Sequence, residues 1–341
     1  MLKIIFYTAL ILSSAQLQAY DFQRIADMHV MPVYQRLVKQ TIELDEAAKI
    51  SCNEQSRENI EILQHKSSDA FLAWQGAQHL RFGPVQFFSR EHRFAFWPDK
   101  RGVVGKQLNK LIQDPALSTE NFDLTQKSIA LQGFSALERL IYVDSNIDDK
   151  RCVLVAEITK NLRNMSEGIL NDWVAGNDSY LKYFIKPNSK NLIYKTESEL
   201  ASELLNSFYT ELEFIIKQKL DRPLGSNLEK GRGRLAEAWR SKSALPAIYE
   251  NLNACYKLYQ ITFAPELVDD TLKKEIETSF QDAFSTLTKI KVPLSVAVGN
   301  VDQRTDVEQL RAQVVRIKHL VTRDMASQLE LSLGFNSLDG D

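Results

Sequence analysis

The sequence predicts an all-α protein made of two helical bundles, with about four helices in each half. Most long segments repeat their apolar residues at the spacing that places them on one face of a helix. The 341 residues include only 13 glycines and 9 prolines, fewer than the usual proportions of about 7% and 5%. No segment alternates convincingly between apolar and polar residues, although residues 291–298 form a short β-prone run.

The first 19 residues have the layout of a secretory signal peptide. Lys3 supplies the only charge, residues 4–12 form an apolar run broken only by Thr8, and residues 13–19 are small and polar. The apolar run is too short to span a bilayer stably. We therefore expect cleavage after Ala19 and a mature chain that begins at Tyr20. No cysteine follows the run, so we expect export to a periplasm without a lipid anchor.

The first helical half covers residues 20–180. Apolar stripes predict its helices, and Asp148 and Asp149 mark the beginning of the last one. The predicted helices span residues 22–48, 55–80, 120–142 and 148–173.

The second helical half covers residues 190–341. An Asn-, Ser-, Pro- and Gly-containing polar stretch at residues 176–195 separates it from the first half. Each half has the size of an ordinary domain. The predicted helices of the second half span residues 197–219, 243–261, 269–289 and 304–331.

The charge pattern excludes several classes of partner. The formal net charge is −2, and no block of like charges is present. Without a basic field, we expect no nucleic-acid partner. No second apolar stretch approaches the length of a membrane span, so we expect none after signal cleavage.

The three cysteines, Cys52, Cys152 and Cys255, allow three pairings in an oxidising compartment. Three buried free thiols are the alternative. We favour a disulfide between Cys52 and Cys152, because both lie at the ends of predicted elements in the same half. Cys255 lies in the middle of a predicted helix, and we expect a buried thiol there.

Two irregular stretches, residues 81–101 and 333–341, interrupt the helices. The first is dense in arginines and aromatic residues, a concentration typical of functional loops. Two interpretations remain open. The arginines line a cleft for an anionic ligand, because their guanidinium groups match carboxylate or phosphate. Alternatively, they pair with the carboxylates of Asp99, Glu138, Asp339 and Asp341 and lock the two halves together.

The segment containing Gly133, Ser135 and Glu138 lies within the predicted helix 120–142. It resembles the Gly-x-His-x-x-Glu motif of the imelysin family of exported bacterial proteins, with serine in the place of histidine. Three further stretches, in family order and spread over the mature chain, strengthen the resemblance. They are Arg81-Phe82-Gly83-Pro84 with Phe96-Trp97-Pro98-Asp99, then Glu237-Ala238-Trp239-Arg240-Ser241-Lys242-Ser243, and Gly334-Phe335-Asn336-Ser337-Leu338-Asp339-Gly340-Asp341.

The resemblance implies that the two bundles pack together with a ligand site at their interface, and that the protein is linked to the uptake of iron or another metal. It also implies a peptidase label, because the family includes an insulin-cleaving metalloproteinase. The residues that we assign to the interface site are Arg93, Trp97, Arg101, Ser135, Glu138, Trp239, Arg240, Asn336 and Asp339.

The chemistry of this site argues against a straightforward transfer of the family's metal. A serine hydroxyl is a poor ligand for the zinc, copper or iron that an imidazole and a carboxylate would hold. Glu138 remains as a candidate metal ligand, and His92 is the best histidine candidate because it lies in the arginine-rich loop beside Glu91. The cofactor, if there is one, would be a divalent metal or iron.

No complete catalytic set is recognisable. The sequence contains no His-Glu-x-x-His or Gly-x-Ser-x-Gly motif. We therefore predict an exported, non-catalytic binding or accessory protein of metal uptake, with a small anionic or metal-containing ligand and an envelope protein as candidate partner. The alternatives are a metallopeptidase, and an interaction protein with a vestigial metal site.

Overall fold

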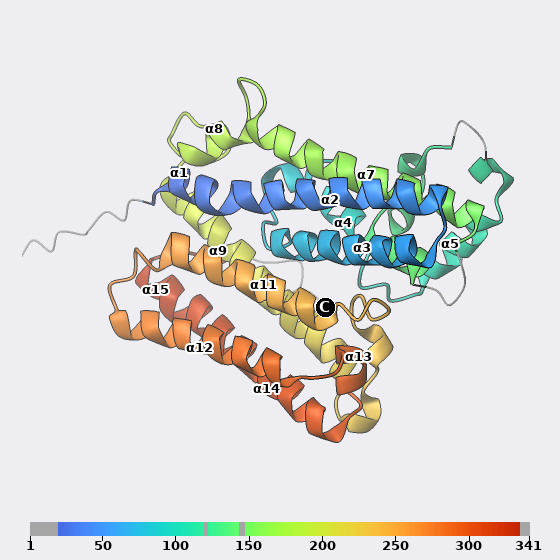
Figure 1. The fold of residues 1–341 in the computed structure, drawn as a ribbon. Coiled ribbons are helices and arrows are strands. Elements are labelled where there is room, and N and C mark those ends of the chain that lie inside the picture. The colour runs from blue at the N-terminus through green and yellow to red at the C-terminus, as the bar shows by residue number, and fades with distance from the viewer. Residues whose placement is uncertain (1–19, 119–121, 143–146, 335–341) are drawn as a thin grey trace, which may run out of the picture.

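The computed structural model describes residues 20–118, 122–142 and 147–334, and all regular elements in these ranges are helical. This confirms the all-α prediction (Figure 1). The longest helices are α2 (Met31–Asn53), α3 (Arg57–Ala77), α7 (Asp149–Val174), α9 (Glu197–Phe214), α11 (Ala244–Leu258), α12 (Asp270–Lys289) and α14 (Val301–His319). Shorter helices are α1 (Phe22–Ile25), α4 (Arg90–Phe94), α5 (Val103–Ile112), α6 (Phe134–Ile141), α8 (Tyr180–Ile185), α10 (Arg222–Leu224), α13 (Leu294–Ala297) and α15 (Ala326–Gln328).

Polar residues fix where the long helices begin. The side chains of Ser56, Asp148 and Thr196 each accept a hydrogen bond from the backbone N–H three residues later, at the starts of α3, α7 and α9. Such caps satisfy donors that have no partner within the helix. They place these boundaries within two residues of the positions expected from the sequence.

Several long helices contain a π turn. One connects α1 to α2 at Ala26–Val30, immediately before Pro32. Proline lacks the N–H that an α-helix would need at this position, so a local change of helical pitch there is understandable. Another π turn, Ile215–Asp221, continues α9 into α10 and carries Lys219 into the interior.

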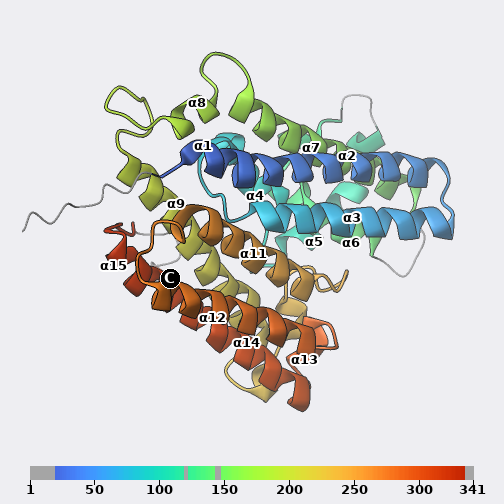
Figure 2. The same cartoon turned by 60° about the vertical axis from the view of Figure 1, so that its left-hand side comes forward.

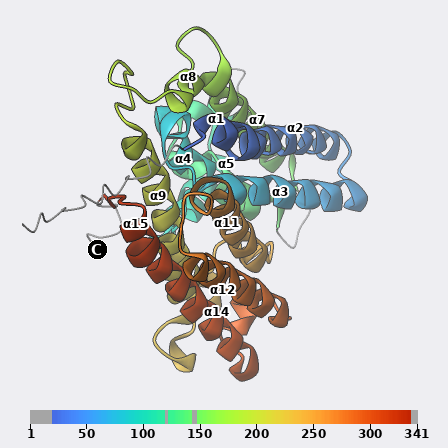
Figure 3. The ribbon, with the colours of Figure 1, turned by 90° about the vertical axis from the view of Figure 1, so that its left-hand side faces the viewer.

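The helices form two layered halves (Figures 1 and 2). In the first half, α2 lies between α7 and α3. In the second half, α9, α11, α12 and α14 pack around a common interior, which Figure 3 shows from the side. The contact between α3 and α11 joins the halves, and one apolar core runs through both. Arg36 and Glu250 strengthen the junction through two hydrogen bonds of 2.6 and 3.1 Å.

The predicted helix at 120–142 is wrong over most of its length. The described part contains short 3-10 turns at Leu124–Gln126 and Ile129–Leu131, and only α6 is α-helical. Asp123 and Ser128 accept hydrogen bonds from backbone N–H groups two residues later, which favours turns over a continuous helix. Ser135 consequently lies in the first turn of α6, not in the middle of a long helix.

The β-prone run at residues 291–298 contains no strand, and its residues Leu294–Ala297 form the short helix α13 directly after Pro293. Among the helices of the described ranges, none is long and apolar enough to cross a membrane.

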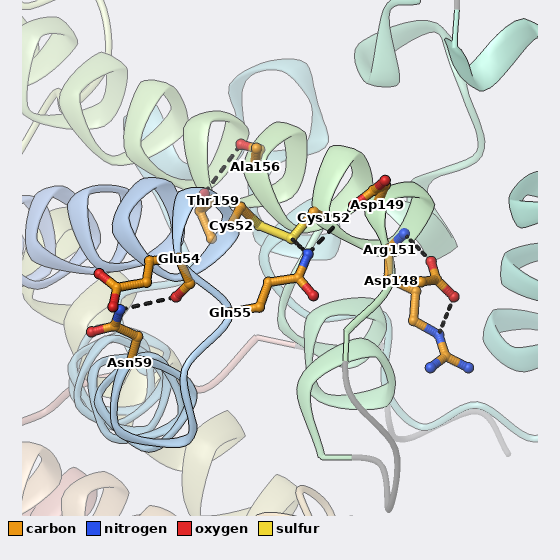
Figure 4. Close-up of a disulfide and its surroundings, with 10 residues drawn as sticks. All are labelled: Cys52, Glu54, Gln55, Asn59, Asp148, Asp149, Arg151, Cys152, Ala156 and Thr159. Atoms are coloured by element: carbon orange, nitrogen blue, oxygen red, sulfur yellow. Dashed lines mark hydrogen bonds and ion pairs between the residues drawn. A yellow bond between two sulfur atoms is a disulfide. The ribbon is translucent and has the colours of Figure 1, made fainter.

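A disulfide joins Cys52, near the end of α2, to Cys152, in the first turn of α7 (Figure 4). The two Cα atoms are 5.5 Å apart. Gln55 donates a hydrogen bond of 3.4 Å to Asp149 beside the bridge. Cys255 is a buried free thiol in α11.

Candidate functional site

A pocket lies between the two halves and is called the cavity below. The first half contributes residues of α3, the loop at 96–99, α5 and α6, and the second half contributes Arg222 and the loop at 234–243. The side chains that matter most for its chemistry are Trp97, Asp99, Ser135, Glu138, Arg139, Arg222, Arg234, Glu237, Trp239 and Arg240.

Gly133 sets the position of α6 beside this cavity. A Cβ atom at this residue would lie 2.1 Å from the carbonyl oxygen of Arg93 and 2.2 Å from that of Phe94. Only glycine permits this approach to the backbone of α4. The close packing holds the first turn of α6, including Ser135, at the cavity wall.

The carboxylate of Glu138 is occupied by protein donors. Its Oε1 accepts hydrogen bonds from the backbone N–H of Arg240 at 3.0 Å and that of Ser241 at 2.9 Å, and from the Ser241 hydroxyl at 3.0 Å. Arg240 Nη1 lies 3.8 Å from Oε2. Burial raises the pKa of Glu138, and the hydrogen bonds from Ser241 and the charge of Arg240 oppose that shift.

A buried ion pair anchors the loop whose N–H groups bind Glu138. Lys219 Nζ lies 2.8 Å from Oε2 of Glu237, and both side chains are at most 5% exposed. Lys219 also donates a hydrogen bond to Gln75 of α3. Positive φ angles at Ala238 and Lys242 bend the loop back on itself. The loop is therefore anchored to both halves of the molecule.

Asp99, the third carboxylate of the cavity, also accepts hydrogen bonds from the protein. Its two oxygens accept hydrogen bonds from the backbone N–H groups of Val103 at 2.7 Å and Val104 at 3.1 Å, at the beginning of α5. A carboxylate is favourable at a helix N-terminus because of the helix dipole. Asp99, Glu138 and Glu237 thus each have protein partners and do not converge on a common point.

Four arginines give the cavity its positive character. The guanidinium carbon of Arg240 lies 4.3 Å from the centre of the Trp239 ring, and that of Arg234 lies 5.4 Å from the same ring. Burial lowers the pKa of Arg240, and the neighbouring charges of Arg139 and Arg234 lower it further, against the opposite effect of Glu138. Positive charges therefore crowd together at this wall.

Arg222 forms another wall of the cavity. Its guanidinium carbon lies 5.7 Å from the centre of the Trp97 ring. Burial lowers the pKa of Arg222, while the charge of Asp99 raises it. Its buried Nη1 has no hydrogen-bond partner among the residues that the structure describes. Buried donors in folded proteins are normally paired, so this donor is suited to an acceptor on a ligand or a water molecule.

The cavity brings together Trp97, Ser135, Glu138, Trp239 and Arg240 of the residues assigned from the sequence. Arg93 does not line it, because its guanidinium donates to Gln132 at 2.6 Å and Asn161 at 3.2 Å. Arg101 is exposed in the turn before α5, and it does not line the cavity either. Asn336 and Asp339 lie outside the described residues.

The residues present do not fit a metal centre at the motif. Glu138 already accepts three hydrogen bonds on Oε1, and Ser135 offers only a neutral hydroxyl. His92 lines a different cavity, where its Nε2 lies 3.4 Å from Glu91. Within the described residues, no group of three or more His, Cys, Asp or Glu side chains is arranged to hold a metal ion.

Three arginines that were not predicted from the sequence also line the cavity: Arg139, Arg222 and Arg234. Arg139 lies directly after Glu138, and its position on a cavity-facing helix was a usable signal. Arg222 and Arg234 belong to the second half and stand in no motif, so only the packing of the two halves reveals them.

Comparisons with known proteins agree with the fold. The sequence profile described as Imelysin matches residues 30–321. The structure is similar to an imelysin-like protein from Psychrobacter arcticum 273-4, with a TM-score of 0.77 and 19% identity over 92% of this chain and 96% of the other. It is also similar to a putative iron-regulated protein A precursor from Parabacteroides distasonis ATCC 8503, with a TM-score of 0.74 and 11% identity over 90% and 96%. Comparison with curated protein sequences finds no match.

Proposed function

Since the chain belongs to the imelysin family, we propose that it is an exported, non-catalytic binding protein of iron or metal uptake whose interface cavity binds an anionic ligand. The signal-peptide pattern of residues 1–19 supports export. The likeness to a protein described as iron-regulated supports the link to iron. A metal reaches this cavity as part of an anionic chelate, not as a bare ion.

One observation carries the proposal: the cavity presents four arginines, while each of its three carboxylates is engaged by the protein. Arg139 and Arg234 are neighbours of Arg240, and Arg222 keeps an unpartnered donor. Guanidinium groups bind carboxylates and phosphates through paired, charge-assisted hydrogen bonds. The rings of Trp97 and Trp239 hold the arginines and present flat apolar surfaces to the same ligand.

Isothermal titration at low ionic strength tests this proposal with citrate, ferric citrate and the bare ions Zn²⁺, Cu²⁺ and Fe²⁺ as probes. We expect saturable binding of citrate or ferric citrate that weakens as salt is added. Arg222→Gln and Arg240→Gln should each weaken it by roughly tenfold or more. Arg57→Gln is the matched control, because Arg57 is 93% exposed and lies outside the cavity.

Two results would overturn the proposal. The first is the absence of saturable binding of both citrate species, whether or not a bare ion binds at a site that is lost in Glu138→Ala. The second is hydrolysis of a peptide that co-purifies with the protein and is stopped by a chelator, which would establish the metallopeptidase alternative.

A further inference from the structure

A second cavity shares Phe96 and Trp97 with the first. Its other walls come from the C-terminal end of α3, the loop that follows it, Glu91 and His92 of α4 with the segment after that helix, the 3-10 turn at Ile129–Leu131, and α9. Further lining residues are Trp74, Gln78, Leu80, Arg81, Val85 and Phe214. Like the first cavity, it is built from both halves of the protein.

The chemistry of the second cavity differs from that of the first. Aromatic and aliphatic residues form one part of its lining, and Gln78, Glu91, His92 and Thr210 add polar groups. Its arginine, Arg81, is bound through Nη2 to Glu211 at 2.9 Å. Two buried donors on its lining residues, Trp74 Nε1 and Arg81 Nε, have no hydrogen-bond partner among the described residues. Trp74 is 2% exposed. The aromatic and aliphatic part of the lining suits an apolar or aromatic group of a ligand.

The side chain of Trp97 forms part of the wall of both cavities. Arg222 of the first cavity lies over its ring, and the same ring packs edge-on against Phe214 of the second at a centroid distance of 5.8 Å. A group bound on either side of Trp97 therefore contacts the same side chain.

We infer that the two cavities are subsites of one ligand site, and that the ligand is an elongated, amphiphilic anion. Its charged end binds the arginines of the first cavity, and its aromatic or apolar end enters the second. This inference rests on the proposed function of the first cavity and adds the class of ligand.

A pair of probes that differ by one phenyl ring tests the inference: benzoate and biphenyl-4-carboxylate, titrated into the full mature chain. Burial of the added ring should make the biphenyl compound bind roughly tenfold more tightly or better. Ile129→Trp fills the second cavity from a residue that is 37% exposed and absent from the first. It should abolish the gain and leave the affinity for benzoate unchanged.

The control for an added tryptophan is Ile62→Trp, because Ile62 is 45% exposed and lines neither cavity. Thr210→Trp fills the second cavity from α9 and should reproduce the effect of Ile129→Trp if that variant is unstable. Equal affinity for the two probes, or an equal loss of both in Ile129→Trp, overturns the inference and leaves the proposed function intact. Absence of binding by both probes and by the citrate species overturns both.

Discussion

Glu138 accepts two hydrogen bonds from Ser241, one from the backbone N–H at 2.9 Å and one from the hydroxyl at 3.0 Å. The glutamate belongs to α6 of the first half, and the serine belongs to a loop of the second. The family motif residue therefore acts here as a positioning residue that fastens the loop carrying Trp239 and Arg240.

Replacing Glu138 by alanine should lower the free energy of unfolding by about 1.5–3 kcal/mol, because buried donors of the loop lose a charged acceptor. Glu138→Gln keeps an acceptor and should cost less. Because burial raises the pKa of Glu138, the folded state holds its proton more tightly than the unfolded chain does. The stability of the wild type relative to Glu138→Gln should therefore fall as the pH rises through the raised pKa. Urea unfolding at a series of pH values measures this, and a pH-independent difference would contradict it.

Gly133→Ala should destabilise the protein by about 1–3 kcal/mol or more, because the new Cβ would overlap two carbonyl oxygens of the backbone near α4. Thermal unfolding measures the effect. Gly299→Ala is the matched control, since a Cβ there meets only Val296 O, at an ordinary 3.8 Å. Similar small changes in both variants would show that α6 is free to move away from α4.

Lys219→Met should cost about 3–5 kcal/mol, because it leaves the carboxylate of Glu237 buried without its cation. The double variant Lys219→Met/Glu237→Leu should cost less than the sum of the two single changes, since it removes both charges together. A double-mutant cycle from urea unfolding measures the coupling. Strict additivity would mean that the pair contributes nothing specific.

Acidification should destabilise the protein through His29 and His79, whose Nε2 atoms are 2.6 Å apart in the core. Burial, with the charge of Lys257, lowers the pKa of His29 to about 3. Burial, with the charge of His29, lowers the pKa of His79, against the opposite effect of the Gly76 backbone. The unfolded chain then binds more protons than the folded one, so stability falls as the pH drops from the usual histidine pKa toward the lowered values.

This loss should approach about 1.4 kcal/mol per pH unit for each histidine. Unfolding measured between pH 7.5 and 4.5 gives the slope. His29→Gln/His79→Gln should flatten it, whereas His65→Gln, at a 75% exposed side chain, should not. An unchanged slope in the double variant would assign the acid sensitivity to carboxylates.

The double variant Cys52→Ser/Cys152→Ser should lose about 2–5 kcal/mol, because the disulfide connects residues 100 positions apart and restricts the unfolded chain. A reducing agent should destabilise the wild type by a similar amount and leave the variant unaffected. Cys255→Ser serves as the control, and the wild-type response to the reducing agent should persist in it.

The helical fold was predictable because apolar periodicity and polar caps act locally. Ser56, Asp148 and Thr196 begin helices close to where the sequence indicated. The helix expected at 120–142 failed for two reasons. Asp123 and Ser128 stabilise local turns that apolar periodicity does not detect, and Gly133 passes against the carbonyls of Arg93 and Phe94, which are distant in the sequence. Periodicity along one segment contains no information about such an approach.

The site was only partly predictable for the same reason. Trp97, Glu138, Trp239 and Arg240 stood in recognisable stretches and line one cavity. Arg93 stood in such a stretch too, yet it binds Gln132 and Asn161. The serine of the motif argued against transferring the metal chemistry, and the loss of the metal stays a prediction. The loop of the other half that donates hydrogen bonds to Glu138 could be seen only after the halves were packed together.

The bridge between Cys52 and Cys152 has a consequence for proteolysis. It closes a covalent ring that contains Trp97, Ser135 and Glu138, which are walls of the first cavity. A protease that cuts the chain once within residues 53–151 releases no fragment, because both pieces stay tethered through the sulfur atoms. The protein nicked in this segment therefore keeps these walls of the first cavity until the disulfide is reduced.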